Sequence, residues 1–326
     1  MSARSVAREI LGRTLLRRNL ILPFVRERRY VFVYHDVSEP DSPHHWPVYS
    51  TPFRTFVHQV AFLRSLFRLV PLAEIVAPSS GRDRGHLAAI VFDDGFRSVL
   101  DRAHPHLASL GIPFAVFVNR SAIERNALWC TDVVLGRADL PYMSRLLREY
   151  IEAGAVDLEA FLVDPLGHLI ASPRLTDDYT AFSREPRAGA PLYMSADEIR
   201  FLHSKGVTVG SHTVSHKVLA RCSDEALAGE VIGNAHYLAG LLGEEIQHLA
   251  LPFGFEGTFD RRVLGLARST HRYVYSSRRA FFTGIEARRW GFVVPRIGLR
   301  SESPEEIMVS INLPFFTRRG PRFPDA

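Results

Sequence analysis

The chain has 326 residues, of which 46% are hydrophobic and 23% charged, and its formal net charge is +5 at pH 7. This size and composition allow a full hydrophobic core, which excludes an extended, disordered protein and favours one large α/β domain over two modest ones. Lys205 and Lys217 are the only lysines, so arginine carries nearly all of the positive charge.

The first 29 residues form a basic N-terminal arm that contains eight arginines. Within it, Ile10 to Val25 is partly apolar, but Arg13, Arg17 and Arg18 interrupt the run. A spanning helix needs about 20 nearly uncharged residues, so we expect neither a transmembrane segment nor a secretory signal, and we predict a cytoplasmic protein. The arm has two possible interpretations. It could make peripheral contact with an anionic membrane surface, or it could form a solvated amphipathic helix.

Predicted strands and helices alternate in the first part of the chain. Apolar runs typical of buried parallel strands occur at 30–34, 87–92 and 113–118. Helical spacing of apolar residues predicts helices at 53–69 and 96–110, with 70–76 as a connector and a loop rich in proline and histidine at 40–52. Strand, helix and strand at this spacing imply parallel pairing.

The pattern becomes irregular and partly polar between about 121 and 191, which predicts an inserted lobe or a lid. Regular alternation then returns. The predicted strands are 207–210, 246–251, 273–275 and 292–294, and the predicted helices are 195–204, 224–242 and 304–311. Repeated βα units with polar residues after the strands indicate a barrel whose chemistry lies at the C-terminal ends of the strands.

Two adjacent carboxylates, Asp93 and Asp94, directly follow the predicted strand 87–92. A buried ionised carboxylate needs a cation or several donors, and neighbouring carboxylates push each other's pKa values apart. One can then bind a metal while the other acts as a base. The next residue, Gly95, permits close approach of the backbone to such a site. In the alternative, Asp93 caps the following helix and Asp94 alone binds the metal.

His212 and His216 are four residues apart, just after the predicted strand 207–210. If this segment turns into a helix, both imidazoles face one side, as a divalent metal requires. Two histidines and one aspartate would leave open positions on the metal for water and a substrate oxygen. The same ligands also occur in iron(II) oxygenases, although the predicted βαβ alternation contradicts their usual antiparallel barrels.

Three ordered motifs resemble the polysaccharide deacetylase family, also called the NodB homology or carbohydrate esterase 4 family. Val91-Phe-Asp-Asp-Gly95 is similar to its first motif, Ser211-His-Thr-Val-Ser-His216 to its second, and Ala250-Leu-Pro-Phe-Gly254 to its third. The resemblance implies an α/β fold, a deformed (β/α)7 barrel of NodB type, with an inserted lobe at about 121–191 between the first and second motifs. The catalytic domain would then span 30–320.

The resemblance also implies roles for the motif residues. Asp93 would be the general base, and Asp94, His212 and His216 would bind a divalent metal, which we expect to be zinc, with nickel, cobalt or iron as alternatives. The third motif would shape the substrate groove, and the backbone N–H of its aromatic residue would help to hold the oxyanion. The residues concerned are Pro252, Phe253 and Gly254.

The chain departs from the family pattern at Ala250, where the third motif usually has an arginine that orients the base. Arg296, in Val294-Pro-Arg-Ile-Gly298, is our candidate for this role, and the alternative is a surface or structural arginine. Trp129 and Trp290 could stack on sugar rings or lie in the core. Cys130 and Cys222 have no metal or redox spacing, which predicts two thiols.

The family's usual C-terminal motif with its catalytic histidine is missing after Leu299. Val33-Tyr-His-Asp-Val37 resembles a circularly permuted counterpart, as in the subgroup of bacterial exopolysaccharide deacetylases. The resemblance implies that His35 is the general acid. With an ordinary histidine pKa of about 6.5, we expect it to stay protonated beside the carboxylates near neutral pH.

Together, the resemblance implies a metal-dependent hydrolase that removes N-acetyl groups from N-acetylhexosamine units of a surface polysaccharide or its lipid-linked precursor. The expected partner is an acetylated sugar or polysaccharide, and no nucleic acid is expected. Three alternatives stay open, which are an O-acetyl esterase on the same scaffold, the iron(II) oxygenase, and an inactive carbohydrate-binding relative. The last is motivated by Ala250.

Overall fold

The computed structural model describes residues 11–14, 28–42, 45, 50–77, 85–128, 130, 191–289, 291, 293–299 and 302–316. Most of the predicted basic arm and of the predicted insert lies outside these residues, as do Trp129 and Trp290. Among the described helices, none is both long and apolar enough to cross a membrane.

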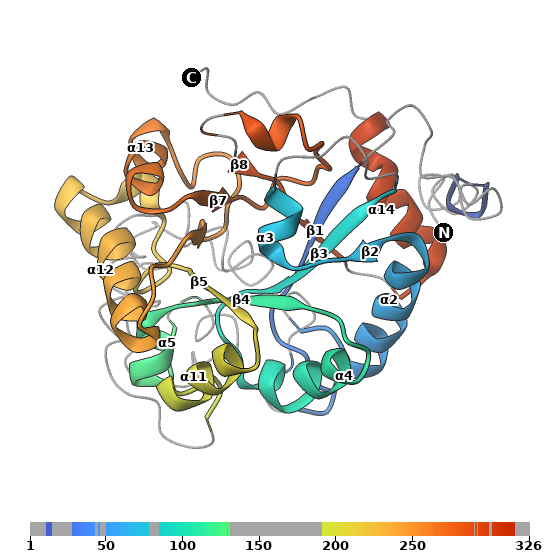
Figure 1. The fold of residues 1–326 in the computed structure, drawn as a ribbon, viewed down its shortest axis with the longest axis horizontal. Coiled ribbons are helices and arrows are strands. Elements are labelled where there is room, and N and C mark those ends of the chain that lie inside the picture. The colour runs from blue at the N-terminus through green and yellow to red at the C-terminus, as the bar shows by residue number, and fades with distance from the viewer. Residues whose placement is uncertain are drawn as a thin grey trace, which may run out of the picture.

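A single curved sheet forms the centre of the molecule (Figure 1). Its strands follow the order β8-β7-β6-β5-β4-β3-β1-β9, β2 pairs with β3, and all of these pairings are parallel. The strands are β1 (Arg29–Tyr34), β2 (Arg68–Leu69), β3 (Leu87–Phe92), β4 (Phe114–Val118), β5 (Thr208–Ser211), β6 (His248–Ala250), β7 (Tyr273–Tyr275), β8 (Val293–Val294) and β9 (Ile297–Gly298).

The two edges of the sheet belong to one short segment of chain. β8 pairs with β7 and β9 pairs with β1, while only Pro295 and Arg296 separate β8 from β9. Proline has no backbone N–H to donate, which suits it to this break in the ladder. The segment bridges the two ends of the sheet and completes a ring with β1, β3, β4, β5, β6 and β7. The predicted deformed (β/α)7-type barrel is confirmed, with this segment, and no ladder between the described strands β8 and β9, closing it.

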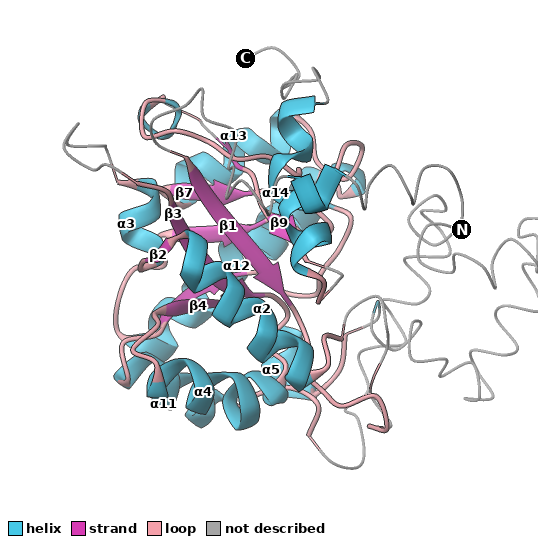
Figure 2. Ribbon diagram, turned by 90° about the vertical axis from the view of Figure 1, so that its right-hand side faces the viewer, coloured by secondary structure: helices cyan, strands magenta, loops and turns pink. Residues whose placement is uncertain are grey.

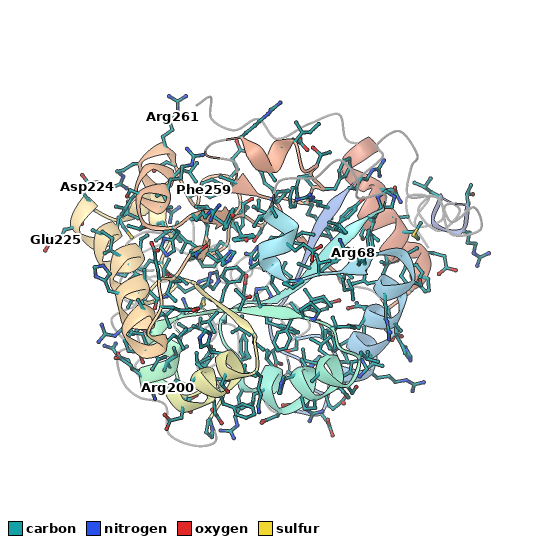
Figure 3. All side chains as sticks on the ribbon, viewed as in Figure 1. Arg68, Arg200, Asp224, Glu225, Phe259 and Arg261 are labelled. Carbon is teal, nitrogen blue, oxygen red and sulfur yellow. The ribbon has the colours of Figure 1, made fainter. Side chains whose placement is uncertain are left out.

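Helices surround the sheet (Figures 1 and 2). Figure 3 shows charged side chains such as Arg200 and Glu225 projecting from these helices away from the sheet. The helices are α2 (Phe53–Leu66), α3 (Leu72–Val76), the π-helix η1 (Val99–Ala103), α4 (His104–Ser109), α5 (Arg120–Arg125), α11 (Ala196–Ser204), the 3₁₀ helix η3 (Leu219–Arg221), α12 (Asp224–Leu242), α13 (Arg261–Thr270), the 3₁₀ helix η4 (Glu286–Arg288) and α14 (Pro304–Phe316).

Both faces of the central strands are buried, which explains their uninterrupted apolar runs. Every residue of β1, β3 and β4 is buried. Alternate residues of β3 belong to different clusters: Ile90 and Phe92 pack with the surrounding helices, whereas Ala89 and Val91 pack with the smaller interior cluster. The core thus holds the C-terminal end of β3, and the aspartates after it, in a fixed place.

Local sequence signals account for the ends of the longer helices. Ser195 and Glu198 form a reciprocal capping box at the start of α11, and the Ser223 side chain accepts a hydrogen bond from Ala226 N at the start of α12. Gly243, with φ of 75°, ends α12 in the left-handed conformation that favours glycine. The predicted helix 224–242 is therefore confirmed.

Some short elements differ from the prediction. The connector predicted at 70–76 is wrong, because Leu72–Val76 is helix α3, with Leu72, Ile75 and Val76 buried. Neither α13 nor β9 is predicted from the sequence. Part of the predicted insert packs in the core, since Ala122, Leu128 and Cys130 are buried, and neither Cys130 nor Cys222 forms a disulfide.

Candidate metal and catalytic centre

The predicted functional side chains meet at the C-terminal ends of the barrel strands. Asp93 and Asp94 follow β3, His212 follows β5, and His35 follows β1. Arg296 lies in the break between β8 and β9. In a parallel barrel these strand ends share one face, so residues far apart in the sequence converge there.

Asp94, His212 and His216 form a compact buried cluster. One potential ligand atom from each lies within 4.8 Å of the others. The Nε2 atoms of His212 and His216 are 3.5 and 3.6 Å from Asp94 Oδ1. Among the described residues, neither carboxylate oxygen of Asp94 has a hydrogen-bond partner. A buried carboxylate without donors, beside two imidazole nitrogens, fits a divalent cation.

The surroundings of this cluster favour the protonation states that metal ligation needs. His212 Nδ1 lies 2.8 Å from the carbonyl oxygen of Ala250, which can only accept, so Nδ1 carries the proton and Nε2 offers its lone pair to the cluster. Burial lowers the pKa of both His212 and His216. Without a cation, burial and the charge of Asp93 raise the pKa of Asp94, and a bound cation would oppose that effect.

The second motif reaches this geometry through a strained loop and not through a helix. Thr213 and His216 have φ values of 67° and 58°, so the segment does not turn into a helix and the two imidazoles converge by another route. Asp94 and Phe253 also have positive φ, at 67° and 60°. Of the five described non-glycine residues in this conformation, four therefore lie at the site, where strained backbone commonly marks functional constraint.

Polar side chains from neighbouring elements hold the second motif, residues 211–216, in place, and we call this segment the histidine loop. Asn119 donates to the carbonyl oxygens of His212 and Thr213. From α12, Asn234 Nδ2 donates to Ser211 Oγ at 2.8 Å, and Glu230 accepts from the backbone N–H and the hydroxyl of residue 215. These bonds satisfy polar groups that the unusual backbone would otherwise leave buried and unpaired. No sequence motif marks Asn119, Asn234 or Glu230.

Asp93 has different neighbours from Asp94. Arg296 NH1 donates to Asp93 Oδ1 at 2.7 Å, and both side chains are almost fully buried. Arg296 Nε also donates to the carbonyl oxygen of Ser276 at 3.2 Å, which fixes the guanidinium. Burial alone would raise the pKa of Asp93, but the charge of Arg296, followed by His212 and His35, lowers it to about 2. The Asp93 side chain is thus an ionised base candidate rather than a helix cap.

His35 faces Asp93 across the cleft, with Nε2 3.9 Å from Asp93 Oδ2. Burial lowers the pKa of His35 to about 4; Asp93 opposes this effect, and Arg296 and His212 add to it. Because 28% of the side chain remains exposed, water weakens the effect of burial. The lowered pKa of His35 still contradicts our expectation of a protonated imidazole near neutral pH. The carboxylate of Asp93 is already paired with Arg296, so it attracts the proton of His35 too weakly.

The third motif forms a tight turn beside the histidines. The ring of Phe253 lies edge-on to that of His216, with centroids 4.6 Å apart, and it lines the cleft. Gly254 has φ of 64°, and a Cβ there would lie 2.5 Å from Ser277 N, so only glycine fits. Pro252 accepts a hydrogen bond from Gly254 N at 2.6 Å within the turn. Phe253 is thus the member of this motif that lines the cleft.

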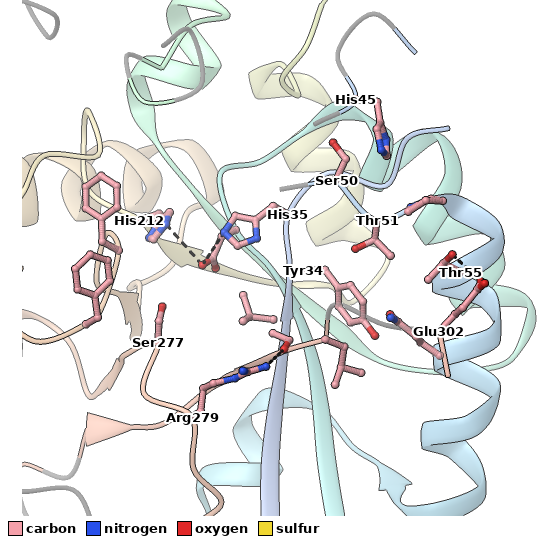
Figure 4. A pocket seen from close by; sticks show the side chains of 18 of the residues that line it. Tyr34, His35, His45, Ser50, Thr51, Thr55, His212, Ser277, Arg279 and Glu302 are labelled. Carbon is pink, nitrogen blue, oxygen red and sulfur yellow. Dashed lines mark hydrogen bonds and ion pairs between the residues drawn. The ribbon is translucent and has the colours of Figure 1, made fainter. Parts of the chain in front are cut away.

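A cleft of about 730 Å³ opens over these residues (Figure 4). Its described lining includes His35, Asp93, His212 and His216, so the candidate catalytic groups are accessible from it. His45, from the loop predicted at 40–52, also lines the cleft. The wall further includes Tyr34, from the motif at 33–37, and seven residues that no sequence motif marks: Ser50, Thr51, Thr55, Gln59, Ser277, Arg279 and Glu302.

Comparison with known proteins supports this description. Residues 80–274, more than half of the chain, match the family described as Polysaccharide deacetylase. No curated protein sequence matches the chain.

Among solved structures, the chain is similar to the Streptococcus pyogenes deacetylase PplD in complex with acetate (TM-score 0.58, 14% identity, 87% of this chain and 98% of that chain). It is also similar to IcaB from Ammonifex degensii (TM-score 0.56, 20% identity, 88% and 99%). A third similar structure is the BpsB deacetylase domain from Bordetella bronchiseptica (TM-score 0.52, 15% identity, 85% and 97%). Identities at this level indicate a shared fold.

Proposed function

Since the chain belongs to the polysaccharide deacetylase family, we propose that it hydrolyses the N-acetyl groups of N-acetylhexosamine units in a surface polysaccharide or its lipid-linked precursor. The observation that carries this proposal is the pair of aspartates with opposite surroundings. Asp94 faces two imidazoles and has no described hydrogen-bond donor, whereas Asp93 is ionised beside Arg296. This arrangement separates metal binding from base catalysis.

In this proposal Asp94, His212 and His216 hold a divalent cation, with zinc as the expected metal and nickel, cobalt or iron as alternatives. Two histidines and one carboxylate suit each of these ions. When bound, the cation supplies Lewis acidity that polarises the amide carbonyl and makes water more acidic. The buried carboxylate of Asp94 then gains the compensating charge that it lacks among the described side chains.

The remaining steps belong to residues of the chain. Asp93 accepts a proton from the attacking water, and Arg296 holds its carboxylate toward the cleft. The backbone N–H of Phe253 contributes a donor to the oxyanion, while its ring bounds the acetyl site. His35 delivers a proton to the leaving nitrogen, so that water and the amide yield acetate and a free amine.

The lowered pKa of His35 changes how it would act as the acid. A mostly neutral imidazole must receive a proton during the reaction, and Asp93 is its nearest described carboxylate at 3.9 Å. We therefore propose that the proton taken by Asp93 is the one that His35 passes on. This transfer moves a proton within the site and leaves the net charge of the site unchanged, whereas a permanently charged imidazolium would add a positive charge.

Acetate release tests the proposed function. The purified protein, loaded with zinc, should release acetate from N-acetylglucosamine oligomers, and chelation of the metal should abolish the release. Asp93→Asn keeps the volume but removes the base, so we expect a loss of about 100-fold or more. An equally active Asp93→Asn protein would refute the mechanism.

Two further measurements separate the alternatives. Release from O-acetylated but not N-acetylated sugars would favour the esterase. Oligosaccharide binding with no hydrolysis at all would favour the inactive relative. The parallel barrel and the family membership already argue against the iron(II) oxygenase.

A further inference from the structure

The cleft extends beyond the catalytic centre, and the proposed mechanism uses only one of its ends. Phe253 lies beside His216 at one end. The other end is lined by four polar residues, which we call the distal end: Tyr34, Thr55, Gln59 and Glu302. Figure 4 shows Thr55 and Glu302 on the opposite side of His35 from His212. The distal end is therefore continuous with the catalytic centre and has no role in the hydrolysis itself.

Tyr34 indicates that the distal end binds a polar ligand. Tyr34 is the last residue of β1 and is only 2% exposed, yet its hydroxyl has no hydrogen-bond partner among the described residues. Burial raises the pKa of this phenol, so it remains protonated and can donate. A buried hydroxyl without a partner is costly and rare in native proteins. A ligand hydroxyl in the cleft would satisfy it, and the buried amide of Gln59 lies on the same wall.

Glu302 gives the distal end a negative charge. Thr55 Oγ1 donates to Glu302 Oε2 at 3.0 Å, which fixes the carboxylate, and no described cation lies within ion-pair distance of it. Besides histidines, the described wall of the cleft has three charged residues. They are Asp93 in the catalytic centre, Glu302 in the distal end, and Arg279. Arg279 lies on the Ser277 side and donates to Gly298 O at 2.9 Å (Figure 4). An exposed carboxylate in the wall of the cleft complements a cationic ligand.

We infer that the distal end binds a second sugar unit of the same chain and selects one with a free amino group. This inference rests on the proposed function. An ammonium group complements Glu302, while sugar hydroxyls complement Tyr34, Thr55 and Gln59. The cleft volume of about 730 Å³ lies well within the range of pockets that enclose ligands larger than a single acetamide group. A unit already deacetylated would then help to place its acetylated neighbour at the catalytic centre.

The test compares disaccharides of N-acetylglucosamine that carry two acetyl groups with those from which either one has been removed, in both the 1,4- and the 1,6-linkage. For the wild-type protein we expect one mono-amine disaccharide to have a kcat/KM about three- to five-fold above that of the fully acetylated one, because a partly exposed ion pair contributes little more. Added salt should reduce this preference. Glu302→Gln, which keeps the shape and the Thr55 hydrogen bond, should bring the ratio close to one.

Glu306→Gln is the matched control, because Glu306 is exposed on α14 and does not line the cleft. It should keep the wild-type ratio. The inference is overturned if the wild-type protein shows no preference, or if Glu302→Gln retains it. If no disaccharide releases acetate, the proposed function fails. Calorimetric binding of the fully deacetylated disaccharide then still tests the distal end, since Glu302→Gln should weaken that binding by the same factor.

Discussion

Two neighbouring carboxylates behave differently because each faces a different set of side chains. Asp93 is paired with Arg296, whose charge outweighs the burial that would raise its pKa. Asp94 faces imidazoles and the charge of Asp93, so its pKa is raised in the absence of a cation. The barrel thus gives two different environments to residues that are adjacent in the sequence, and Arg296 is the residue that separates them.

Replacement of Arg296 tests this separation. Arg296→Gln leaves the Asp93 carboxylate buried without its cation, so we expect the free energy of unfolding to fall by about 3–5 kcal/mol. Activity should fall by about 100-fold, because the base loses its orientation. Arg296→Lys keeps the charge but loses the fork that also reaches Ser276, and it should recover part of both losses. Denaturant unfolding and acetate release measure the two effects.

Zinc content provides the control for this series. No ligand of the proposed metal site contacts the Arg296 guanidinium, so both variants should still bind one zinc per chain. Full activity of Arg296→Gln would show that another residue orients the base. It would also revive the view of Arg296 as a purely structural residue.

At the scale of elements, α12 connects the barrel to the proposed metal centre. Asn234 and Glu230 are one helical turn apart and both contact the histidine loop, while Asn234 also donates to the carbonyl oxygen of Val118 at the end of β4. Thr213 and His216 adopt positive φ in this loop. We infer that the helix maintains a backbone conformation that the loop would not keep alone.

Asn234→Ala should therefore weaken metal binding more than it affects the fold. Loss of a group that orients metal ligands typically reduces metal affinity by about 10- to 100-fold. Titration of the metal-free protein with Co²⁺, followed by its absorption spectrum, measures the affinity without reference to activity. Glu225→Gln, at the exposed start of the same helix (Figure 3), should bind Co²⁺ as the wild type does. Equal affinity of Asn234→Ala and wild type would contradict the positioning role.

The turn of the third motif offers a second test at this scale. Gly254 and Gly257 both have positive φ, of 64° and 87°, but only at Gly254 would a Cβ meet the backbone, 2.5 Å from Ser277 N. Gly257→Ala should cost about 1 kcal/mol for the left-handed conformation alone. Gly254→Ala should cost about 1–3 kcal/mol more, and it should lower activity because the turn that carries Phe253 must shift. Thermal unfolding and kcat/KM of the two variants, measured side by side, test this prediction. Equal losses of stability and activity in both variants would exclude a specific steric role for Gly254.

The ends of several elements could be predicted because the signals are local. Ser195, Ser223 and Gly243 lie at helix ends and specify them through side-chain caps and a left-handed residue. β9 has only two residues, too few to produce a pattern. The histidine spacing would also suit a helix at 212–216, but Thr213 and His216 adopt positive φ, which tertiary hydrogen bonds impose and sequence pattern does not reveal.

At the scale of the whole molecule, the site could be predicted only where it resembles a linear motif. The aspartates and histidines stand out because they follow apolar strands. Asn234 and Glu230 do not, since polar residues on a long helix usually mark its solvated face. Glu302 and Thr55 are 247 residues apart and meet only when the barrel brings α2 next to the chain that leads into α14. The topology, rather than any local pattern, creates the distal end of the cleft.

The barrel also buries histidines far from the catalytic centre, which makes its stability depend on pH. His248 stacks on Tyr273, and its Nδ1 lies 2.8 Å from the hydroxyl of Tyr275, while His271 lies beside Thr270. Burial lowers the pKa of both imidazoles from 6.5 to about 4; nearby His271 and Arg272 add to the effect at His248. Both histidines therefore fold in the neutral form.

Acid should destabilise the protein through these two groups. Below pH 6.5 the unfolded chain binds protons at both histidines and the folded chain does not, so the free energy of unfolding falls until the folded pKa near 4 is reached. Each histidine contributes about 1.4 kcal/mol for each unit of pKa difference.

Denaturant unfolding of the metal-free protein at several pH values between 4 and 8 measures this effect. The free energy of unfolding should change clearly less with pH in the double variant His248→Gln, His271→Gln than in wild type. His236→Gln replaces an exposed histidine on α12 and should keep the wild-type dependence of the free energy of unfolding on pH. Parallel curves for all three proteins would mean that the buried histidines are not the source of the acid sensitivity.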